Sequence, residues 1–400
     1  MLFTDVQITD ILESHVRQGG GIHELLRMTL EAIMRGERQA FLEDWGSGNK
    51  ANGFRSASAY GHGQKLEFKV PRDRLGAFRP LIMGLLRDQD EECDRLVSSL
   101  YSKGLTQSQV SDVIEQVYGK QYSTSSISRM LDGIREEVNM WMSRPLEKHY
   151  PVVFIDALYV KVRTLGSVEP EAFFVILGVT PERTREVLAL GHLPTESATG
   201  WAALLDEIKS RGVESIGLLV ADGIKGLDEA LALRFPETPL QRCVVHLMRR
   251  ITSKVKVKDR EAVAQDLKEV FTTGIRDDKP QDGWNRLQSF CEKWGKRSRS
   301  IKMMVGNPWY LNYFTYLNYD CRMQSMIYTT NWIERLQRDF RRVLRMRAVM
   351  PNPESVLLLM AKTAMDKKAY TRKVPKLAFD KSLFPDGGHD HHLENQQDLF

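Results

Sequence analysis

Runs of apolar residues in the middle of the chain have the length and composition of β-strands. Val, Ile, Leu and Phe dominate them, and polar or glycine-containing segments separate them. The runs lie at 152–163, 172–179, 185–191, 215–221 and 241–245. Between the third and fourth runs, residues 197–211 repeat apolar positions at helical spacing, and a further helix runs from about 223 to 234 before the fifth.

The order of these segments predicts the fold class. Three consecutive strands followed by helix, strand, helix and strand is the order of an RNase H-like mixed sheet flanked by helices, which is an α/β fold. Asp156 lies within the first strand and Asp222 ends the fourth. Because those two strands can be neighbours in such a sheet, we expect the two carboxylates to lie close together.

The first 45 residues have helical spacing of apolar residues, and a different pattern follows them. Gly46–Gly63 is rich in Gly, Ser and Asn, which predicts a loop. Lys65–Val70 then alternates as a short strand. Basic residues around this strand are available for phosphates, although a solvated charged surface also explains them.

Residues 90–145 predict three helices. The first ends at Gly104, and Thr106 is a good N-cap for the second. The third opens at Ser123–Arg129. Helix, short glycine-containing turn and a helix that begins with small hydroxyl residues and Arg is typical of a helix-turn-helix.

The predicted apolar faces of the second and third helices consist of Val110, Val113, Ile114 and Val117, and of Ile127, Leu131 and Ile134. In a DNA-binding helix-turn-helix, the groove-facing residues are Ser125, Ser126, Ser128 and Arg129. An ordinary helical hairpin with capped ends is the alternative.

The interval from about 247 to 325 predicts helices only, so it reads as an insertion after the last strand. It begins with Arg249, Arg250, Lys254, Lys256 and Lys258, and then becomes rich in Trp and Tyr. Aromatic residues at this density favour a core over base stacking. Trp309 and Tyr310, which follow a probable turn, are the aromatics we expect to be most exposed.

Three acidic residues carry the candidate chemistry: Asp156, Asp222 and Glu334. The two aspartates occupy strand positions otherwise filled by Val, Ile and Leu, where an uncompensated charge is costly. Three carboxylates together repel one another unless a divalent cation neutralises them, and oxygen ligands favour Mg²⁺ or Mn²⁺ over Zn²⁺. The set therefore predicts two-metal chemistry on phosphodiesters.

Arginines dominate the predicted helix that carries Glu334. Steps of four, three and four residues place Arg338, Arg341 and Arg345 on the stripe of Glu334, with Ile333, Leu336, Phe340 and Val343 on the buried stripe. Simple pairing four residues apart explains one such contact. It does not explain the excess of arginines, which a phosphate-binding edge does.

Composition adds little to this picture. The net charge is +5 with a pI near 8.9, which mildly favours an anionic partner. Four dispersed cysteines argue against a disulfide scaffold. No signal-peptide pattern and no apolar run of about 20 residues is evident, so we expect a soluble, intracellular protein without membrane contact.

Four segments resemble the bacterial insertion-sequence transposases of the mutator superfamily, which are DDE-type enzymes. They are Phe154–Arg163, Ala221–Gly226, Pro239–His246 and Thr329–Arg335. The resemblance covers residues 20 to 370 and implies that Asp156, Asp222 and Glu334 form the catalytic triad. It also implies an RNase H-like fold with an all-helical insertion, binding of terminal inverted repeats in double-stranded DNA, and homodimers. At Trp332 this sequence departs from many relatives, which have a small residue there.

Cys243 and His246 fit the C-x-x-H signature of the same family. Zinc usually takes four ligands in a structural site, and the sequence offers no second pair. A structural or supporting role near the active site is the better interpretation. In that role, His246 could hydrogen-bond a scissile phosphate.

The resemblance and the patterns together divide the chain into six parts. Residues 1–88 form an N-terminal region that binds DNA ends and 89–145 a helix-turn-helix domain, 146–246 and 327–372 the two parts of the catalytic domain, 247–326 the insertion and 373–400 a polar, disordered tail. The expected function is DNA transposition: cleavage at the terminal repeats and transfer to target DNA, with two Mg²⁺ or Mn²⁺ ions per active site. A catalytically silent DNA-binding regulator and an RNase H-like nuclease without strand transfer are the alternatives.

Overall fold

The protein is described by a computed structural model that covers two compact units, Met1–Arg135 and Glu136–Phe400. The described residues are 21–46, 48–61, 64–118, 122–164, 167–193, 197–367, 370 and 372–384. The helix expected before residue 21 and the tail beyond 384 lie outside them.

A helix and a β-hairpin open the first unit. They are α2 (Ile22–Trp45), β1 (Ala51–Gly61) and β2 (Gln64–Asp73). The loop prediction for Gly46–Gly63 is therefore wrong over 51–61, which pair antiparallel with β2. The pairing arises from packing: buried Phe68 and Val70 of β2 contact Met34 of α2 and fix which face of the hairpin points inward.

Helices α3 (Ile82–Ser102), α4 (Gln107–Tyr118) and α5 (Thr124–Met130) complete this unit, and α6 (Asp132–Met142) crosses its boundary. The three helices expected over 90–145 are present, but the third is interrupted at Leu131. Thr106 caps α4 as expected, because its hydroxyl accepts a hydrogen bond from the Gln109 N–H (3.2 Å). Ile127, Leu131 and Ile134 are buried, whereas Val117 is 63% exposed and does not belong to the packed face.

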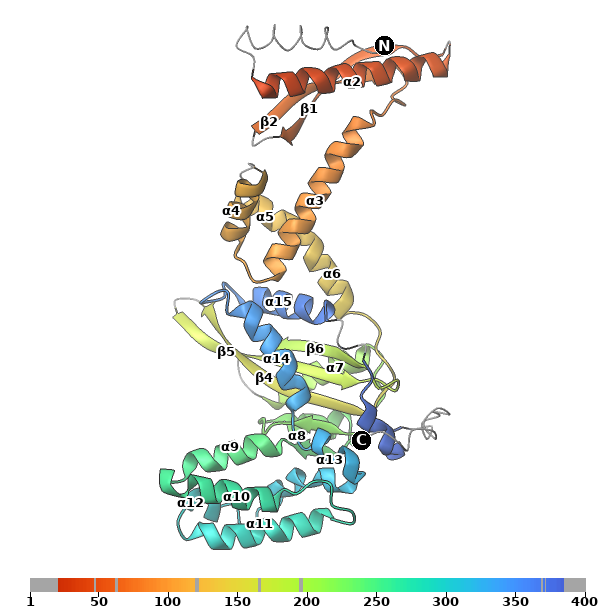
Figure 1. Ribbon diagram of the computed structural model, residues 1–400. Coiled ribbons are helices and arrows are strands. Elements are labelled where there is room, and N and C mark those ends of the chain that lie inside the picture. The colour runs from red at the N-terminus through yellow and green to blue at the C-terminus, as the bar shows by residue number, and fades with distance from the viewer. Residues whose placement is uncertain are drawn as a thin grey trace, which may run out of the picture. The chain divides into compact units, whose positions relative to one another are not determined.

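A five-stranded sheet forms the centre of the second unit (Figure 1). Its strands are β4 (Val152–Thr164), β5 (Ser167–Val179), β6 (Arg185–His192), β8 (Leu219–Ala221) and β9 (Leu240–Arg242). In the order β6-β5-β4-β8-β9, the first two pairings are antiparallel and the last two are parallel. This confirms the mixed α/β sheet predicted from the sequence.

The predicted strand 215–221 is divided at Gly217. Its first part, β7 (Ser215–Ile216), pairs with β3 (His149–Tyr150), and only its second part, β8, joins the main sheet. A side chain at Gly217 would meet the Pro151 carbonyl at 2.7 Å, so glycine permits the close passage between the two pairings.

Helices cover both faces of the sheet (Figure 1). On one face, α7 (Ala198–Ser210) and α8 (Leu227–Arg234) pack into the main core, where Trp201 meets Phe174 edge to face. On the other face, α14 (Asn331–Leu344) crosses β4 and α15 (Pro353–Met365) lies against β6.

Only helical segments lie between β9 and α14 in the described chain, as predicted for the insertion. They are α9 (Val244–Lys254), α10 (Arg260–Val270), α11 (Pro280–Gly295), α12 (Arg299–Lys302), α13 (Cys321–Ile327) and the 3-10 segments η1 (Val257–Asp259), η2 (Pro308–Tyr313) and η3 (Thr315–Asn318). The strand expected to run to 245 ends at Arg242, because α9 begins at Val244.

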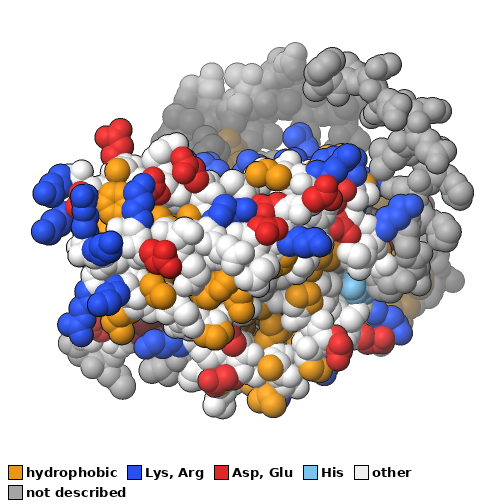
Figure 2. All heavy atoms as spheres, turned by 90° about the horizontal axis from the view of Figure 1, so that it is seen from below, with side chains coloured by type: hydrophobic (Ala, Val, Ile, Leu, Met, Phe, Trp, Pro, Cys, Tyr) orange, Lys and Arg blue, Asp and Glu red, His pale blue; other side chains and the backbone are white. Residues whose placement is uncertain are grey.

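Most aromatic residues of the insertion are core residues, as expected. Trp294, Tyr313, Phe314 and Tyr316 are buried, and even Trp309 is half-buried beneath the Arg242 guanidinium, 3.9 Å from its ring centre. The basic side chains at the start of the insertion are exposed. Figure 2 shows Lys and Arg gathered at the left edge of the face seen from below, on the side where α9 and α12 lie in Figure 1.

After α15 and residues 366–367, the structure describes residue 370 and the segment 372–384. This segment forms η5 (Pro375–Phe379) and η6 (Lys381–Leu383), and Val374, Leu377 and Leu383 are buried. The prediction of a disordered tail from residue 373 is therefore wrong over 373–384, and its remainder lies outside the described residues.

Candidate active site

The topology brings the two aspartates to the same edge of the sheet. β4 and β8 are parallel neighbours, with Ile155 paired to Ala221. Asp156 and Asp222 are the next residues on the two strands, so they follow adjacent positions although 66 residues separate them in sequence (222 − 156). The expected neighbourhood of these strands is confirmed.

Asp156 is the most buried of the three carboxylates, at 7% exposure. Its Oδ1 accepts a hydrogen bond from the Ala157 N–H at 2.8 Å. Burial raises the pKa of Asp156 to about 6, and the nearby carboxylates of Asp222 and Glu334 act in the same direction. The site therefore places negative charge where water cannot screen it.

Asp222 is half-buried at the end of β8, and its Oδ1 accepts a hydrogen bond from the Gly223 N–H at 2.6 Å. Gly223 lies against the insertion: a side chain there would meet Trp309 at 3.3 Å and the guanidinium of Arg250 at 3.6 Å. The aspartate is thus backed by residues of the insertion as well as by the sheet.

Glu334 lies in the first turn of α14, and two contacts orient this helix. The Glu334 carboxylate accepts a hydrogen bond from the Arg249 guanidinium of α9 at 3.5 Å. One turn further on, the buried Gln337 side chain donates from Nε2 to the Ala157 carbonyl at 2.9 Å. Gln337 therefore joins the helix of Glu334 directly to the strand of Asp156.

His246 lies between the carboxylates. Its Nδ1 is 3.8 Å from Asp222 Oδ2, and its Nε2 is 3.9 Å from Glu334 Oε1. A hydrogen bond between the His246 imidazole and the Cys243 side chain is the largest influence on the pKa of His246 and raises it. Burial lowers this pKa, and the negative charges of Asp222 and Asp156 raise it. Together they raise the pKa of His246 to about 9. The raised pKa favours the protonated imidazole, which brings positive charge among the three acids.

Cys243 is fully buried at the start of α9. The Thr330 hydroxyl, at the start of α14, donates to its sulfur at 3.4 Å, and the Val244 N–H donates to the Tyr328 carbonyl at 2.9 Å. These bonds join the first turns of the two helices that carry His246 and Glu334. The position of Cys243 fits the structural interpretation of the C-x-x-H signature.

A pocket of about 370 Å³ opens over these groups. It is lined by Asp156, Ala157, His246, Arg249, Asn331, Glu334, Gln337, Arg338 and Arg341. Two of the three arginines expected on the Glu334 stripe belong to it, while Arg345, which ends α14, does not line it. The pocket combines acids that bind cations with guanidinium groups that bind phosphate.

The candidate helix-turn-helix residues lie in the first unit. Ser125 and Arg129 are exposed, and Ser126 and Ser128 are half-buried. The Ser123 hydroxyl caps α5 by accepting from the Ser126 N–H at 3.1 Å. The turn residues 119–121 lie outside the described chain.

The donor set fits a divalent cation, because it consists of carboxylate oxygens that repel one another. As the side chains stand, no group of three or more His, Cys, Asp or Glu residues in the described ranges is arranged to hold a metal ion. His246 lies where it balances the carboxylates instead. Asp156, Asp222 and Glu334 are the residues that would hold the ion.

The sequence patterns missed three residues of the site: Arg249, Asn331 and Gln337. A signal existed for Gln337, which is an amide among Ile333, Leu336 and Phe340 on the buried stripe of α14. A polar side chain there needs a hydrogen-bond partner. Arg249 lies three residues after His246 and so shares its helix face. Asn331 carried no signal of this kind.

No helix within the part of the chain that the structure describes is both long and apolar enough to cross a membrane.

Comparison with known proteins agrees with the resemblance carried by the motifs. The family model described as "Transposase, Mutator family" matches residues 3–372. The transposase for insertion sequence element IS905 of Lactococcus lactis is 30% identical over 361 residues, covering 88% of this chain and 90% of that protein. The transposase for ISRM3 of Rhizobium meliloti is 32% identical over 346 residues, covering 85% of each. The transposase for IS1201 of Lactobacillus helveticus is 30% identical over 357 residues, covering 89% of this chain and 94% of that protein. The chain therefore belongs to the mutator family of transposases.

Proposed function

We propose that this chain is a DNA transposase that binds the terminal inverted repeats of its insertion sequence and catalyses metal-dependent DNA strand cleavage and strand transfer. The observation that carries the proposal is that Asp156 and Glu334 line one pocket with three arginines and His246, while Asp222 lies 3.8 Å from His246. The strand order and the helices on both faces support an RNase H-like catalytic domain.

Asp156, Asp222 and Glu334 would hold two Mg²⁺ or Mn²⁺ ions, whose chemistry would be to activate the attacking oxygen and to stabilise the leaving 3′ oxygen. The side chains of Arg249, Arg338 and Arg341 bind the flanking phosphates and offset their charge. In cleavage, a water oxygen forms a bond to phosphorus and the bond to the 3′ oxygen breaks, which leaves a 3′-hydroxyl and a 5′-phosphate. In transfer, that 3′-hydroxyl takes the place of water: its oxygen forms a bond to a phosphorus of the target strand, and the bond from that phosphorus to its 3′ oxygen breaks.

His246 responds to the charge of the site. Its protonated ring lies between Asp222 and Glu334, so it balances the acids before cations enter. With metal ions held by the carboxylates, the same ring would be placed to donate a hydrogen bond to a non-bridging phosphate oxygen.

The first unit supplies DNA binding in this proposal. Helices α4 and α5 form the helix-turn-helix, and its groove-facing residues are Ser125, Ser126, Ser128 and Arg129. In the second unit, Arg345 extends the phosphate-binding edge of α14. A homodimer, as the family implies, would hold the two ends of the element together.

The test uses duplex oligonucleotides that carry the ends of the element, taken from the DNA around the coding sequence. We expect cleavage in Mg²⁺ or Mn²⁺, none in EDTA, and loss of cleavage with retained DNA binding in Asp156→Asn. Asp206→Asn, which changes an exposed acid paired with Arg234, is the matched control and should cleave normally. Full activity of Asp156→Asn would overturn the assignment.

The same assay separates the two alternatives. A regulator binds the ends without nicking them in any metal. A nuclease without strand transfer cuts but never joins the 3′-hydroxyl to a plasmid target, whereas a transposase produces the joined strand.

A further inference from the structure

A second pocket lies on the opposite side of the first turn of α14. It has a volume of about 150 Å³ and is lined by Ser325, Met326, Thr329, Asn331, Trp332, Arg335 and Lys376. Asn331 lines this pocket and the active-site pocket, so the two are adjacent. We call it the Trp332 pocket. Since liquid water occupies about 30 Å³ per molecule, the volume has room for a phosphate group.

The Trp332 pocket is positively charged. Arg335 and Lys376 line it, and no carboxylate does. The active-site pocket, in contrast, holds Asp156 and Glu334. An anion in the Trp332 pocket therefore meets two cations and no carboxylate, whereas in the active-site pocket it also lies beside two acids.

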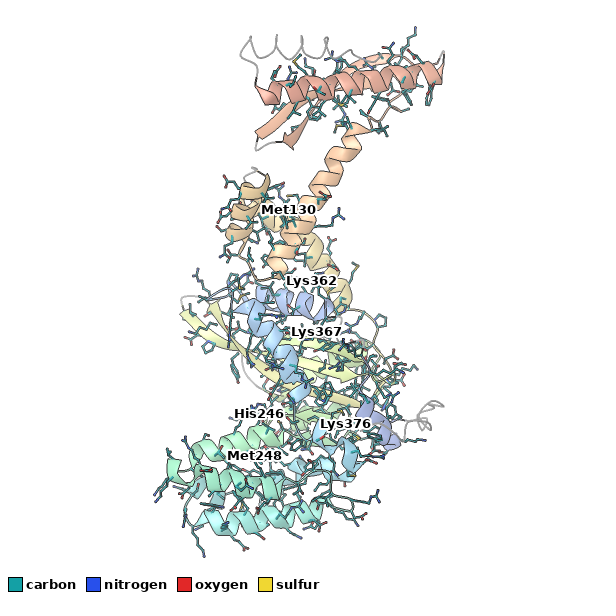
Figure 3. The ribbon with its side chains drawn as sticks, in the orientation of Figure 1. Met130, His246, Met248, Lys362, Lys367 and Lys376 are labelled. Carbon is teal, nitrogen blue, oxygen red and sulfur yellow. The ribbon has the colours of Figure 1, made fainter. Side chains whose placement is uncertain are left out.

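Lys376 is held in place by its segment. Its Nζ donates to the Ser325 hydroxyl of α13 at 3.0 Å, and the Val374 N–H donates to the Arg183 carbonyl at 2.7 Å. Leu377 beside it is fully buried. Figure 3 shows Lys376 on the C-terminal segment near the beginning of α14, with His246 on the other side of that helix end in the same view. A lysine anchored in this way loses less conformational freedom when it binds an anion.

Trp332 forms the apolar wall. It is half-buried, and the guanidinium of Arg185 lies 4.7 Å from its ring centre, with Arg335 at 5.5 Å. These cation–π contacts fix the ring at the surface. A rigid aromatic wall next to two cations suits a nucleotide, whose sugar and base accompany its phosphate.

We propose that the Trp332 pocket binds a backbone phosphate of the DNA strand that passes through the active site, and so fixes the register of the scissile bond. The inference rests on the proposed function. A DNA strand carries a charge about every 3.4 Å along the duplex axis, so a strand with one phosphate in the active site presents others to an adjacent pocket. Phosphate contacts of this kind position the substrate without reading its sequence.

The experiment measures DNA affinity against salt for the full chain and for Lys376→Gln and Arg335→Gln. Each variant removes one phosphate contact, so the slope of log K against log salt should become shallower by about 0.9. Lys373→Gln is the matched control, because it removes an exposed lysine from the same segment that does not line the pocket. Its slope change should be clearly smaller.

Neutral methylphosphonate links, placed one at a time, locate the contact. In the wild type, one position near the scissile bond should weaken binding, and Lys376→Gln should lose part of the sensitivity at that position alone, because Arg335 remains. The scan is run on the element-end duplex and on a target duplex, which shows which of the two strands fills the pocket.

The outcomes separate this inference from the proposed function. If the wild type cleaves and joins DNA but the pocket variants match Lys373→Gln in both measurements, the Trp332 pocket does not bind the strand and the inference is wrong. If the wild type binds the element ends without cleaving them under any metal, the proposed function fails, and a methylphosphonate position that depends on Lys376 would still establish the contact.

Discussion

Replacing Gln337 with methionine tests whether one buried amide sets the geometry of the site. Gln337 is 2% exposed; it donates to the Ala157 carbonyl at 2.9 Å and accepts from Arg341 at 3.0 Å. Methionine has a similar shape but forms neither hydrogen bond. The substitution therefore leaves the apolar packing of α14 in place and removes the link between the helix of Glu334 and the strand of Asp156.

The expected magnitudes for stability and activity differ. Loss of a buried hydrogen bond costs about 1–2 kcal/mol of the free energy of unfolding, partly offset because methionine suits the apolar stripe. A domain with about 5–15 kcal/mol of stability stays folded after such a loss. A displacement of about 1 Å between catalytic groups lowers a rate by up to about a hundredfold. We therefore expect cleavage by Gln337→Met to fall at least tenfold in a protein that is still folded.

The assay pairs urea unfolding with single-turnover cleavage of the element-end duplex in Mg²⁺. Gln281→Met on α11 is the control, because this exposed glutamine bonds only to Asn285 in the next turn. It should change stability by less than about 0.5 kcal/mol and leave cleavage unchanged. Wild-type cleavage by Gln337→Met would refute the positioning role.

Two further predictions concern the scaffold. Gly226→Ala should destabilise the protein more than Gly274→Ala. Both glycines have a positive φ, +76° and +82°, which costs alanine about 1–2 kcal/mol. At Gly226 the new Cβ atom would in addition lie 2.4 Å from the backbone nitrogen of Ala198, whereas at Gly274 it would meet no atom within 4 Å. Urea unfolding should resolve a difference of at least about 1 kcal/mol, and equal losses would contradict the clash. Asp278→Asn should cost about 1–3 kcal/mol near neutral pH, because Arg286 bonds both oxygens of this buried carboxylate. Hydrogen bonding to Arg286 lowers the pKa of Asp278, so its contribution is complete above about pH 4 and disappears as the pH falls through the lowered value; unfolding curves that stay equally far apart in acid would contradict this.

The sequence predicted the structure best where burial requires a regular pattern of apolar residues. The strands over 152–163, 172–179 and 185–191 match β4, β5 and β6 within a few residues, because apolar positions on both faces mark a covered sheet. The hairpin strand at 51–61 was missed, since Gly, Ser and Asn have low strand propensity and only pairing with β2 and packing on α2 favour it.

The candidate site divides in the same way. Residues that stand out against their local pattern, such as Asp156 within β4 and Asp222 directly after β8, are visible in the sequence. Residues that matter through contacts made in three dimensions are not. Arg249 contacts Glu334 across 85 positions, and the Trp332 pocket needs Lys376 from a segment expected to be disordered. Such contacts depend on how helices are placed, which local patterns do not encode.

The ends of the insertion explain how the chain keeps Glu334 near the aspartates. Val244 and Tyr328 are 84 positions apart (328 − 244), yet the Val244 N–H donates a hydrogen bond to the Tyr328 carbonyl at 2.9 Å. The start of α9 therefore lies beside the start of α14, whatever the length between them. His246 and Glu334 each lie about one turn into their helices, so a rise of about 1.5 Å per residue brings both to a similar height above this junction. Their 3.9 Å separation follows from that common starting point. Glu334 lies in the first turn of α14, where the partial positive charge of the helix N-terminus favours a carboxylate. The geometry of the site thus depends on the short junction around Cys243 and Thr330, which holds the two ends of the insertion together.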